Sequence, residues 1–192
     1  MNTFDLKKYL KNNPLISEGS NQTYDYNCAM IYFDFPYINK IQDAINPKDI
    51  YYEEGDRTFG LEDEPHCTLL YGLHSEVTTD DIKNITNKYE FTPLKLINVS
   101  LFENEKYDVL KFDVVGEDLH KINEELKKYP FTSDYPDYHP HSTIGYLKSG
   151  KGKRYTEMLK NMEFDVIPNK VVYSKADGEK DIIDIKLKLN YE

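Results

Sequence analysis

A short strand-like motif occurs twice in this chain, beginning at His66 and again at His141. The first copy reads His-Cys-Thr-Leu-Leu-Tyr and the second reads His-Ser-Thr-Ile-Gly-Tyr, so they agree at the His, Thr, aliphatic and Tyr positions. Each copy is followed by a segment of helical periodicity, 78–89 after the first and 153–162 after the second. A repeated strand–helix unit predicts two similar lobes.

The remaining periodicity predicts the order of the other elements. Apolar runs indicate further strands at 27–35, 94–102, 107–115, 163–173 and 181–189. Helical spacing of apolar residues indicates further helices at 37–45 and 117–129. Thr79 is the expected cap of the helix at 78–89. Because neighbouring strands repeatedly lack an intervening helix, we expect an α+β fold and not a doubly wound parallel sheet.

The N-terminal segment differs in character from the rest. Residues 3–13 have the pattern of a short helix that ends before Pro14, and 17–24 have the composition of a linker. We therefore expect a helix and linker at 1–24 and one bilobal domain at 25–192. The helix either packs on the domain or serves as a detachable address or partner segment.

Charge and composition limit the partners. The formal net charge of −10 opposes long nucleic acids, whose binding depends on Lys and Arg at phosphates. No run is long enough for a membrane span, and no secretory signal is evident. Cys28 and Cys67 lie in apolar runs typical of buried, reduced thiols. We expect a cytoplasmic monomer with a small ligand or a nucleic-acid end as its partner.

Strand alternation indicates which side chains of each motif share a face. Strict alternation places the His and Thr of each copy on one face and most of the apolar residues on the other. In the first copy His66, Thr68 and Leu70 share one face, and Cys67, Leu69 and Tyr71 share the other. In the second copy the faces are His141, Thr143 and Gly145 and, opposite them, Ser142, Ile144 and Tyr146. The second set in each copy is expected to pack against helices. Two lobes related by a pseudo-twofold axis would then direct both His-Thr pairs into a shared groove.

Paired histidines and threonines suit the cleavage of a phosphodiester. One neutral imidazole removes a proton from the attacking oxygen, while one protonated imidazole delivers a proton to the leaving oxygen. Histidine serves both roles because its ordinary pKa is about 6.5. The hydroxyls of Thr68 and Thr143 would donate to the non-bridging oxygens, where charge develops. This chemistry requires neither a metal nor a cofactor, and we expect none.

These paired motifs resemble those of the 2H phosphoesterases, the superfamily of bacterial 2′-5′ RNA ligase-like proteins and 2′,3′-cyclic phosphodiesterases. The resemblance covers residues 27–190 and implies a bilobal fold, with antiparallel sheets and outer helices around a central groove. It implies a metal-independent phosphodiesterase in which His66 and His141 are acid and base and Thr68 and Thr143 bind the phosphate. Possible substrates are 2′,3′-cyclic phosphates, 2′-5′ oligonucleotides and cyclic oligonucleotide signals, the last in virus-encoded enzymes that counter host immunity.

The sequence departs from that family in one respect. Many members carry a basic residue shortly after the second motif, whereas this chain has Tyr146 in the motif's last position. Lys148 and Lys151, in the basic stretch 148–154, are the alternative candidates for neutralising a substrate phosphate.

The loop before the second motif offers further candidate contacts. Tyr135 and Tyr138 are candidates for stacking on a base, and His139 is expected at the mouth of the groove. The acidic residues 62–64 precede His66 and should favour its protonated form, which indicates His66 as the acid and His141 as the base.

Three other interpretations compete with this one. His139 and His141 with nearby aspartates could form a metal site, although Pro140 separates them and no second ligand pair supports it. The spacing of residues 145–152 imitates a P-loop, but Gly152 stands where Ser or Thr is needed. The third alternative is a non-catalytic module that binds nucleotide or protein on the same scaffold.

Overall fold

The computed structural model describes residues 24–56, 58–133 and 137–188 of the chain. The predicted helix at 3–13, most of the predicted linker and the candidate Tyr135 lie outside these residues. Within the described residues, no helix combines the length and the apolar character needed to cross a membrane.

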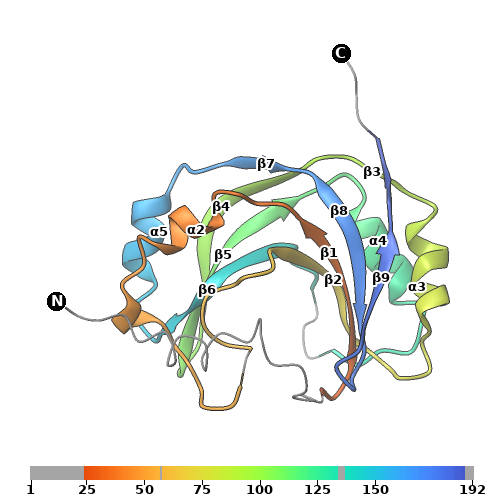
Figure 1. The fold of residues 1–192 in the computed structure, drawn as a ribbon, viewed down its shortest axis with the longest axis horizontal. Coiled ribbons are helices and arrows are strands. Elements are labelled where there is room, and N and C mark those ends of the chain that lie inside the picture. Colours follow the sequence, from red (N-terminus) through yellow and green to blue (C-terminus); the bar gives the residue numbers. More distant parts are fainter. Residues whose placement is uncertain (1–23, 57, 134–136, 189–192) are drawn as a thin grey trace.

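Two four-stranded antiparallel sheets form the sides of an arch (Figure 1). The first sheet has the order β2-β1-β8-β9, with bounds His66–Leu73, Asn27–Phe33, Pro168–Ser174 and Lys180–Asp184. The second has the order β6-β5-β4-β7, with bounds His141–Lys148, Tyr107–Val115, Leu94–Glu103 and Phe164–Val166. A small parallel pair joins β3 (Glu90–Phe91) to β10 (Lys186–Leu187). Each sheet therefore contains one motif strand at its edge.

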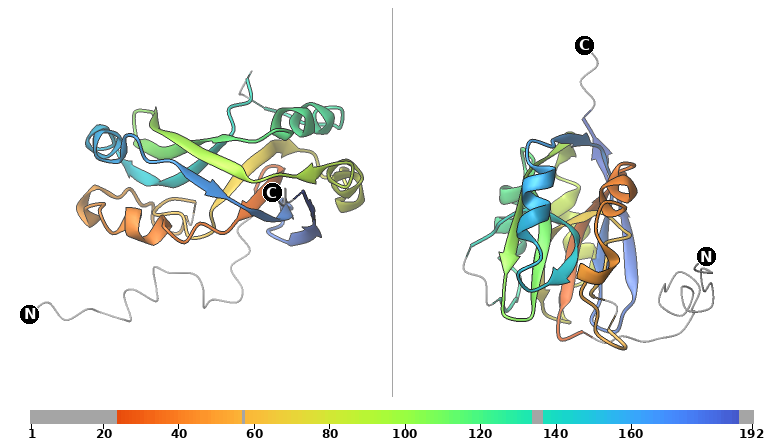
Figure 2. Two further views of the ribbon diagram at one scale, coloured as in Figure 1. Left: turned by 90° about the horizontal axis from the view of Figure 1, so that it is seen from above. Right: turned by 90° about the vertical axis from the view of Figure 1, so that its left-hand side faces the viewer.

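The helices cover the outer ends of the arch, as the two further views confirm (Figure 2). One pair lies beside the first sheet, α3 (Thr79–Thr86) and α4 (Leu119–Leu126). The other lies beside the second sheet, α2 (Ile38–Gln42) and α5 (Lys153–Leu159). The expected bilobal 2H phosphoesterase-like α+β fold is confirmed in its lobes and its antiparallel sheets. The single strand predicted at 163–173 is wrong, because the chain passes there from β7 of the second sheet to β8 of the first.

One capping prediction is wrong by a residue. Thr78, and not Thr79, is the N-cap of α3, because its hydroxyl accepts from the Asp81 backbone N–H while the Asp81 carboxylate accepts from the Thr78 backbone N–H. This reciprocal capping box typically stabilises a helix by about 1 kcal/mol.

The chain exchanges elements between the lobes. Helix α2 follows β1 of the first sheet but packs on β6 of the second, and α4 follows β5 of the second sheet but packs on β2 of the first. The C-terminal strands β8 and β9 return to complete the first sheet. The two lobes are therefore interlocked and cannot separate without unfolding.

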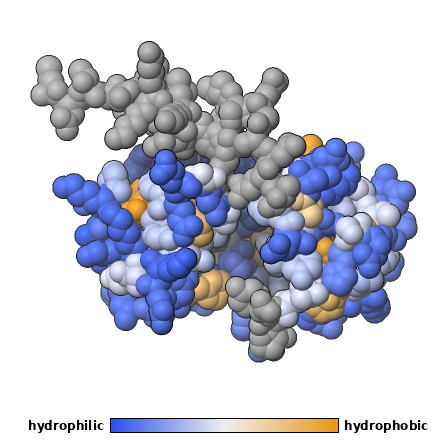
Figure 3. All heavy atoms as spheres, turned by 90° about the horizontal axis from the view of Figure 1, so that it is seen from below, coloured by the Kyte–Doolittle hydropathy of each residue, from blue (hydrophilic) through white to orange (hydrophobic). Residues whose placement is uncertain are grey.

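The two faces of the first sheet carry different apolar clusters. Ala29, Ile31 and Phe33 belong to the main core that is shared with the helices. Met30, Tyr32 and Val172 form a separate buried cluster on the opposite, groove-facing side. The floor of the groove in this lobe is thus apolar, and Figure 3 shows the recess between the lobes from its open side.

Candidate active site

The loop that leads to each histidine pairs with the strand of the other histidine. Residues 60–62 pair with β6, through an antiparallel bridge between Leu61 and Gly145, and then lead to His66. Residues 130–132 pair with β2, through the bridge between Leu73 and Phe131, and then lead towards His141. Because both loops run antiparallel to the opposite motif strand, each returns to that strand's beginning. The strands β2 and β6 therefore start near each other and run outward in opposite directions.

Close backbone approach makes this exchange possible. Gly72, with φ of +96°, would place a Cβ atom 1.8 Å from the Thr132 carbonyl oxygen, so no larger residue fits there. A Cβ on Gly145 would lie 2.8 Å from the Leu61 side chain. Both glycines allow the loops to lie directly against the motif strands.

The two imidazoles are held in the same way. The Nδ1 atoms of His66 and His141 each lie 2.8 Å from the carbonyl oxygen two residues earlier, Glu64 O and His139 O respectively. A carbonyl only accepts, so each Nδ1 must carry a hydrogen. Neither Nε2 has a hydrogen-bond partner among the described residues. Each ring therefore keeps Nε2 for proton transfer, in the same tautomer on both lobes.

Aromatic rings fix the orientation of both imidazoles. Tyr32 stacks on His66 with a centroid separation of 5.2 Å and an interplanar angle of 21°. Phe102 meets His141 edge to face at 4.9 Å. A lysine lies over each of these rings, Lys170 over Tyr32 and Lys111 over Phe102.

The charged neighbours of the two histidines differ. The Glu62 carboxylate lies 3.8 Å from His66 Nδ1, and burial raises the pKa of this carboxyl. The buried Lys111 ammonium lies 2.5 Å from Asp113, the residue paired with His141 across β5 and β6. The pKa of His141 is lowered, mainly by burial and further by the charges of Lys111 and His66, against the hydrogen bond to the His139 carbonyl.

Both threonines lie on the groove side, but strict alternation ends there. In β2 the register skips Leu69, and in β6 it skips Ile144, so each motif strand carries a bulge directly after its Thr. Leu70 consequently packs in the core, contrary to the expectation that it would share the His66 face.

The same bulges correct the placement of the motif tyrosines. Tyr71 pairs with Cys28 and Tyr146 pairs with Val109, residues whose side chains point to the groove face and not to the helices. Beyond the bulge, both tyrosines are therefore on the face of the histidines, although alternation places them on the packing face.

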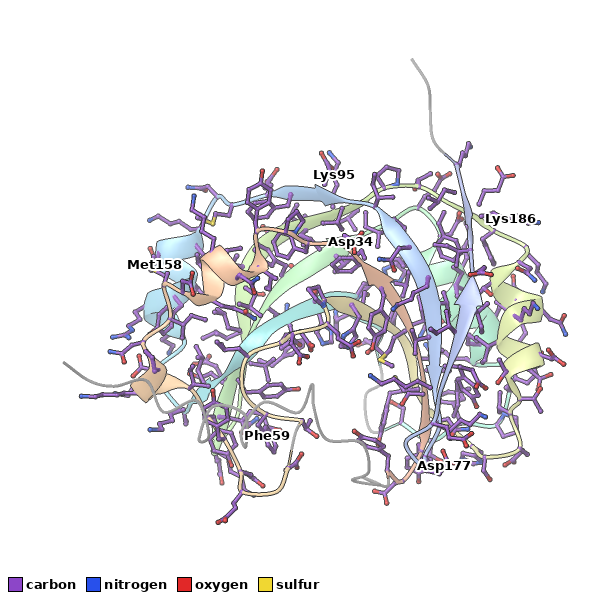
Figure 4. All side chains as sticks on the ribbon, viewed as in Figure 1. Asp34, Phe59, Lys95, Met158, Asp177 and Lys186 are labelled. Atoms are coloured by element: carbon purple, nitrogen blue, oxygen red, sulfur yellow. The ribbon has the colours of Figure 1, made fainter. Side chains whose placement is uncertain are left out.

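Each tyrosine belongs to an aromatic cluster at its end of the groove. Tyr71 meets Tyr26 edge to face at 6.1 Å, and Tyr26 stacks on His74 at 5.8 Å. On the other lobe Tyr146 belongs to a cluster of four rings with Tyr51, Phe59 and Tyr107. The centroids of neighbouring rings in this cluster lie 5.1 to 5.4 Å apart. Figure 4 shows Phe59 at the open side of the arch, on the lobe of β6. These clusters were not predicted, although Tyr71 and Tyr146 are matched positions of the repeat.

Other predicted contacts have different surroundings. The Tyr138 hydroxyl donates to the Thr68 carbonyl at 2.9 Å, and its ring packs on His120 of α4, so it contacts the protein and not an open stacking surface. His139 is exposed and supplies the carbonyl that orients His141.

The basic stretch lies far from the histidines. Lys148 is seven residues along β6 from His141, about 23 Å in an extended strand. Its ammonium donates to the Lys48 carbonyl, and Lys151 is exposed in the following turn. Neither lysine can reach a phosphate held between the histidines. Lys111 is a cation of the site that was not predicted from the sequence, although Lys111 and Asp113 are charged residues at alternate positions of a largely apolar strand.

The alternative sites find little support among the described residues. The described residues contain no group of His, Cys, Asp and Glu side chains arranged to hold a metal ion. The Gly152 amide of the P-loop-like segment donates to the Asp108 carboxylate at 2.8 Å, which places a negative charge where a phosphate would bind. Burial raises the pKa of the Cys28 and Cys67 thiols to about 12, so both remain protonated at neutral pH.

Two solved structures of one protein, Usb1, show the same fold. Usb1 from Kluyveromyces marxianus matches with a TM-score of 0.54 and 10% identity, over 84% of this chain and 98% of that one. The structure of the same protein with uridine monophosphate gives a TM-score of 0.56 at the same identity and coverage. LigT from E. coli, complexed with 3′-AMP, gives 0.42 at 15% identity, over 86% of this chain and 100% of that one.

Sequence comparison identifies the family. No protein of curated function shows significant sequence similarity to the chain. The sequence profile of the anti-CBASS protein Acb1 matches residues 57–180, which include both histidine motifs and both bulges. The chain therefore belongs to the Acb1 family of anti-CBASS proteins and has the fold of the 2H phosphoesterases.

Proposed function

We propose that the protein is a phosphodiesterase that cleaves a small 2′-linked or cyclic nucleotide phosphodiester between His66 and His141. The observation that carries this proposal is the matched state of the two imidazoles. Each holds its Nδ1 hydrogen on a carbonyl 2.8 Å away, and its Nε2 has no partner within the part of the chain that the structure describes; the two rings lie at the start of two strands that meet at the middle of one groove.

The surroundings of the two rings assign the two roles. Burial, and to a lesser degree the charges of Lys111 and His66, lowers the pKa of His141 and favours its neutral imidazole, which can accept a proton. His66 instead has a carboxylate neighbour, Glu62, 3.8 Å from its Nδ1. His141 therefore takes the proton from the attacking oxygen. His66 gives one to the leaving oxygen as its bond to phosphorus breaks, and the chain requires no metal for either transfer.

The aromatic clusters support a nucleotide substrate with a base on either side of the scissile phosphate. Tyr71 lies on the groove face of β2 and Tyr146 on the groove face of β6, at opposite ends of the groove. Stacking on an aromatic ring accepts any base. The family's description as anti-CBASS and the acidic net charge of −10 both favour a small nucleotide signal over a long polyanion. Cyclic oligonucleotides are the first substrates to test, followed by 2′-5′ oligonucleotides and 2′,3′-cyclic phosphates.

A substrate panel in excess EDTA tests the proposed function. We expect turnover of at least one member among cyclic di- and trinucleotides, 2′-5′ dimers and 2′,3′-cyclic mononucleotides, at a rate that EDTA leaves unchanged. Product release is followed by chromatography. Binding of these ligands without turnover would instead identify a non-catalytic nucleotide-binding module, and turnover abolished by EDTA would contradict the two-histidine mechanism.

Replacing Lys111 should change the pH dependence of this reaction. The base must be deprotonated to act, so the acidic limb of the bell-shaped kcat/KM profile reports the pKa of His141. Lys111→Met removes a positive charge that lowers this pKa, and it also frees Asp113, whose charge raises it. The acidic limb should therefore move to higher pH, which is measured from kcat/KM between about pH 4 and pH 10.

The matched control is Lys95→Met, which removes one lysine from the same sheet. Lys95 is exposed on β4 and lies on the convex side of the arch (Figure 4). This variant should keep the wild-type limb. A Lys111→Met profile that coincides with the wild type, or moves to lower pH, contradicts His141 as the base.

A further inference from the structure

Each motif bulge contains a backbone carbonyl that is held by the amide side chain of a distant helix. The Asn123 amide on α4 donates to the carbonyl of Leu69, the extra residue of β2, at 2.6 Å. The Gln42 amide on α2 donates to the carbonyl of Ile144, the extra residue of β6, at 3.0 Å. The two contacts correspond in element order, because α2 follows β1 as α4 follows β5 and each helix packs on the motif strand of the opposite lobe.

Both amides come from the helix that crosses to the opposite lobe. Asn123 belongs to the helix that follows β5 and reaches β2, and Gln42 belongs to the helix that follows β1 and reaches β6. Gln42 also donates to the Glu62 carbonyl at 2.6 Å. A single amide therefore holds both the strand of His141 and the loop that leads to His66.

We propose that Gln42 and Asn123 are positioning residues, which fix the two bulges and thereby aim the His-Thr pairs at one phosphate. This inference rests on the proposed function. A bulge bends its strand and increases the local twist, so its geometry sets the direction of the side chains just before it. In-line displacement requires both imidazoles in register, and an error of about 1 Å in such a constellation costs on the order of 100-fold in rate.

The hydrogen bonding of Asn123 argues for positioning over stability. Its side chain is 1% exposed, and its Oδ1 is a buried oxygen without a hydrogen-bond partner among the described residues. An unpartnered buried oxygen destabilises the fold. An apolar residue would avoid this cost, so the useful part of Asn123 is the Nδ2 donor on the Leu69 carbonyl.

The variants Gln42→Met and Asn123→Leu test this proposal. Each should lower kcat by about 10- to 100-fold while KM stays within about threefold, because the groove walls that bind the substrate remain in place. For Asn123→Leu the melting temperature should change little, since the lost donor and the removed unpartnered oxygen offset each other.

Tyr155→Phe is the matched control for a loss of buried hydrogen bonds. The Tyr155 hydroxyl donates to Asp49 and accepts from the Asn46 N–H, in a site of α5 away from both motifs. This variant should lower the melting temperature and keep the wild-type kcat. If Gln42→Met and Asn123→Leu keep the wild-type kcat, or lose it only as Tyr155→Phe does, the positioning role is wrong.

The same experiment separates failure of this inference from failure of the proposed function. If the wild type turns over no substrate, the Cε1–H NMR resonances of the imidazoles replace kcat as the readout. Gln42→Met should then shift the resonances of both His66 and His141, Asn123→Leu should shift that of His66, and Tyr155→Phe should shift neither. If the resonances of both histidines in the two amide variants coincide with those of the wild type, the positioning role is wrong, whether or not the protein is an enzyme.

Discussion

The variants His66→Asn and His141→Asn should each lose at least about 10³-fold in kcat, with KM changed by less than about threefold. Asparagine places an amide N–H close to the position of the imidazole Nδ1. The hydrogen bonds to the Glu64 and His139 carbonyls, each 2.8 Å in the native protein, can therefore persist. The far edge of the ring, Cε1 and Nε2, is removed while the Nδ1 position is kept, so the loss of rate measures mainly the loss of proton transfer at Nε2. Turnover is compared under saturating substrate at the pH optimum of the wild type.

The double variant separates a concerted pair from two independent residues. Because both proton transfers belong to one displacement, loss of either imidazole already removes the concerted route. His66→Asn with His141→Asn should therefore be little slower than the slower single variant. Rate losses that multiply would contradict joint action on one phosphorus. His120→Asn is the control, because His120 is exposed on α4, where its ring packs on that of Tyr138.

A substrate with a good leaving group distinguishes the acid from the base. A p-nitrophenyl nucleotide phosphodiester releases an anion that needs no proton, so it bypasses the general acid. With this substrate His66→Asn should recover most of its rate, whereas His141→Asn should remain slow. Recovery of the His141 variant instead would exchange the two roles.

The sequence predicts the local features of this site because they depend on local patterns. His66, Thr68, His141 and Thr143 share the groove face since two-residue periodicity holds over the first three positions of each motif. Most of the element order follows in the same way from periodicity and from the turn at 104–106 between β4 and β5, whereas the passage from β7 to β8 interrupts an apolar run that the pattern reads as one strand. These features need no knowledge of distant contacts.

The bulges and the exchanged elements depend on distant contacts and could not be predicted in this way. Leu69 and Leu70 are both apolar, so nothing in the first motif shows that one residue is extra. Gly145 in the second motif is a weaker exception, because an isolated glycine in a strand often marks a bulge or a close approach. The crossing of α2 and α4, which delivers Gln42 and Asn123, is set by packing between lobes and leaves no local signal.

Loss of the threonine hydroxyls should have the second-largest effect. Thr68→Val and Thr143→Val should each lower kcat by about 10²- to 10³-fold, because a donor to the non-bridging oxygens stabilises charge that develops only in the transition state. Valine has the shape of threonine and an equal preference for strands, so β2 and β6 should remain intact. The prediction is checked by steady-state kinetics together with melting temperatures.

Serine variants and a distant threonine complete this test. Thr68→Ser and Thr143→Ser keep the hydroxyl and should stay within about tenfold of the wild-type kcat, since only packing is lost. Thr156→Val removes a hydroxyl that bonds within α5, to the Lys153 carbonyl, and should leave kcat unchanged. Thr143 pairs across the sheet with Lys111, whose ammonium is already bound to Asp113 and Ser100, so the lysine is not free to replace the lost donor. If the valine variants retain the wild-type kcat, the threonine hydroxyls therefore have no part in the catalytic step, and Thr68 and Thr143 only line the groove.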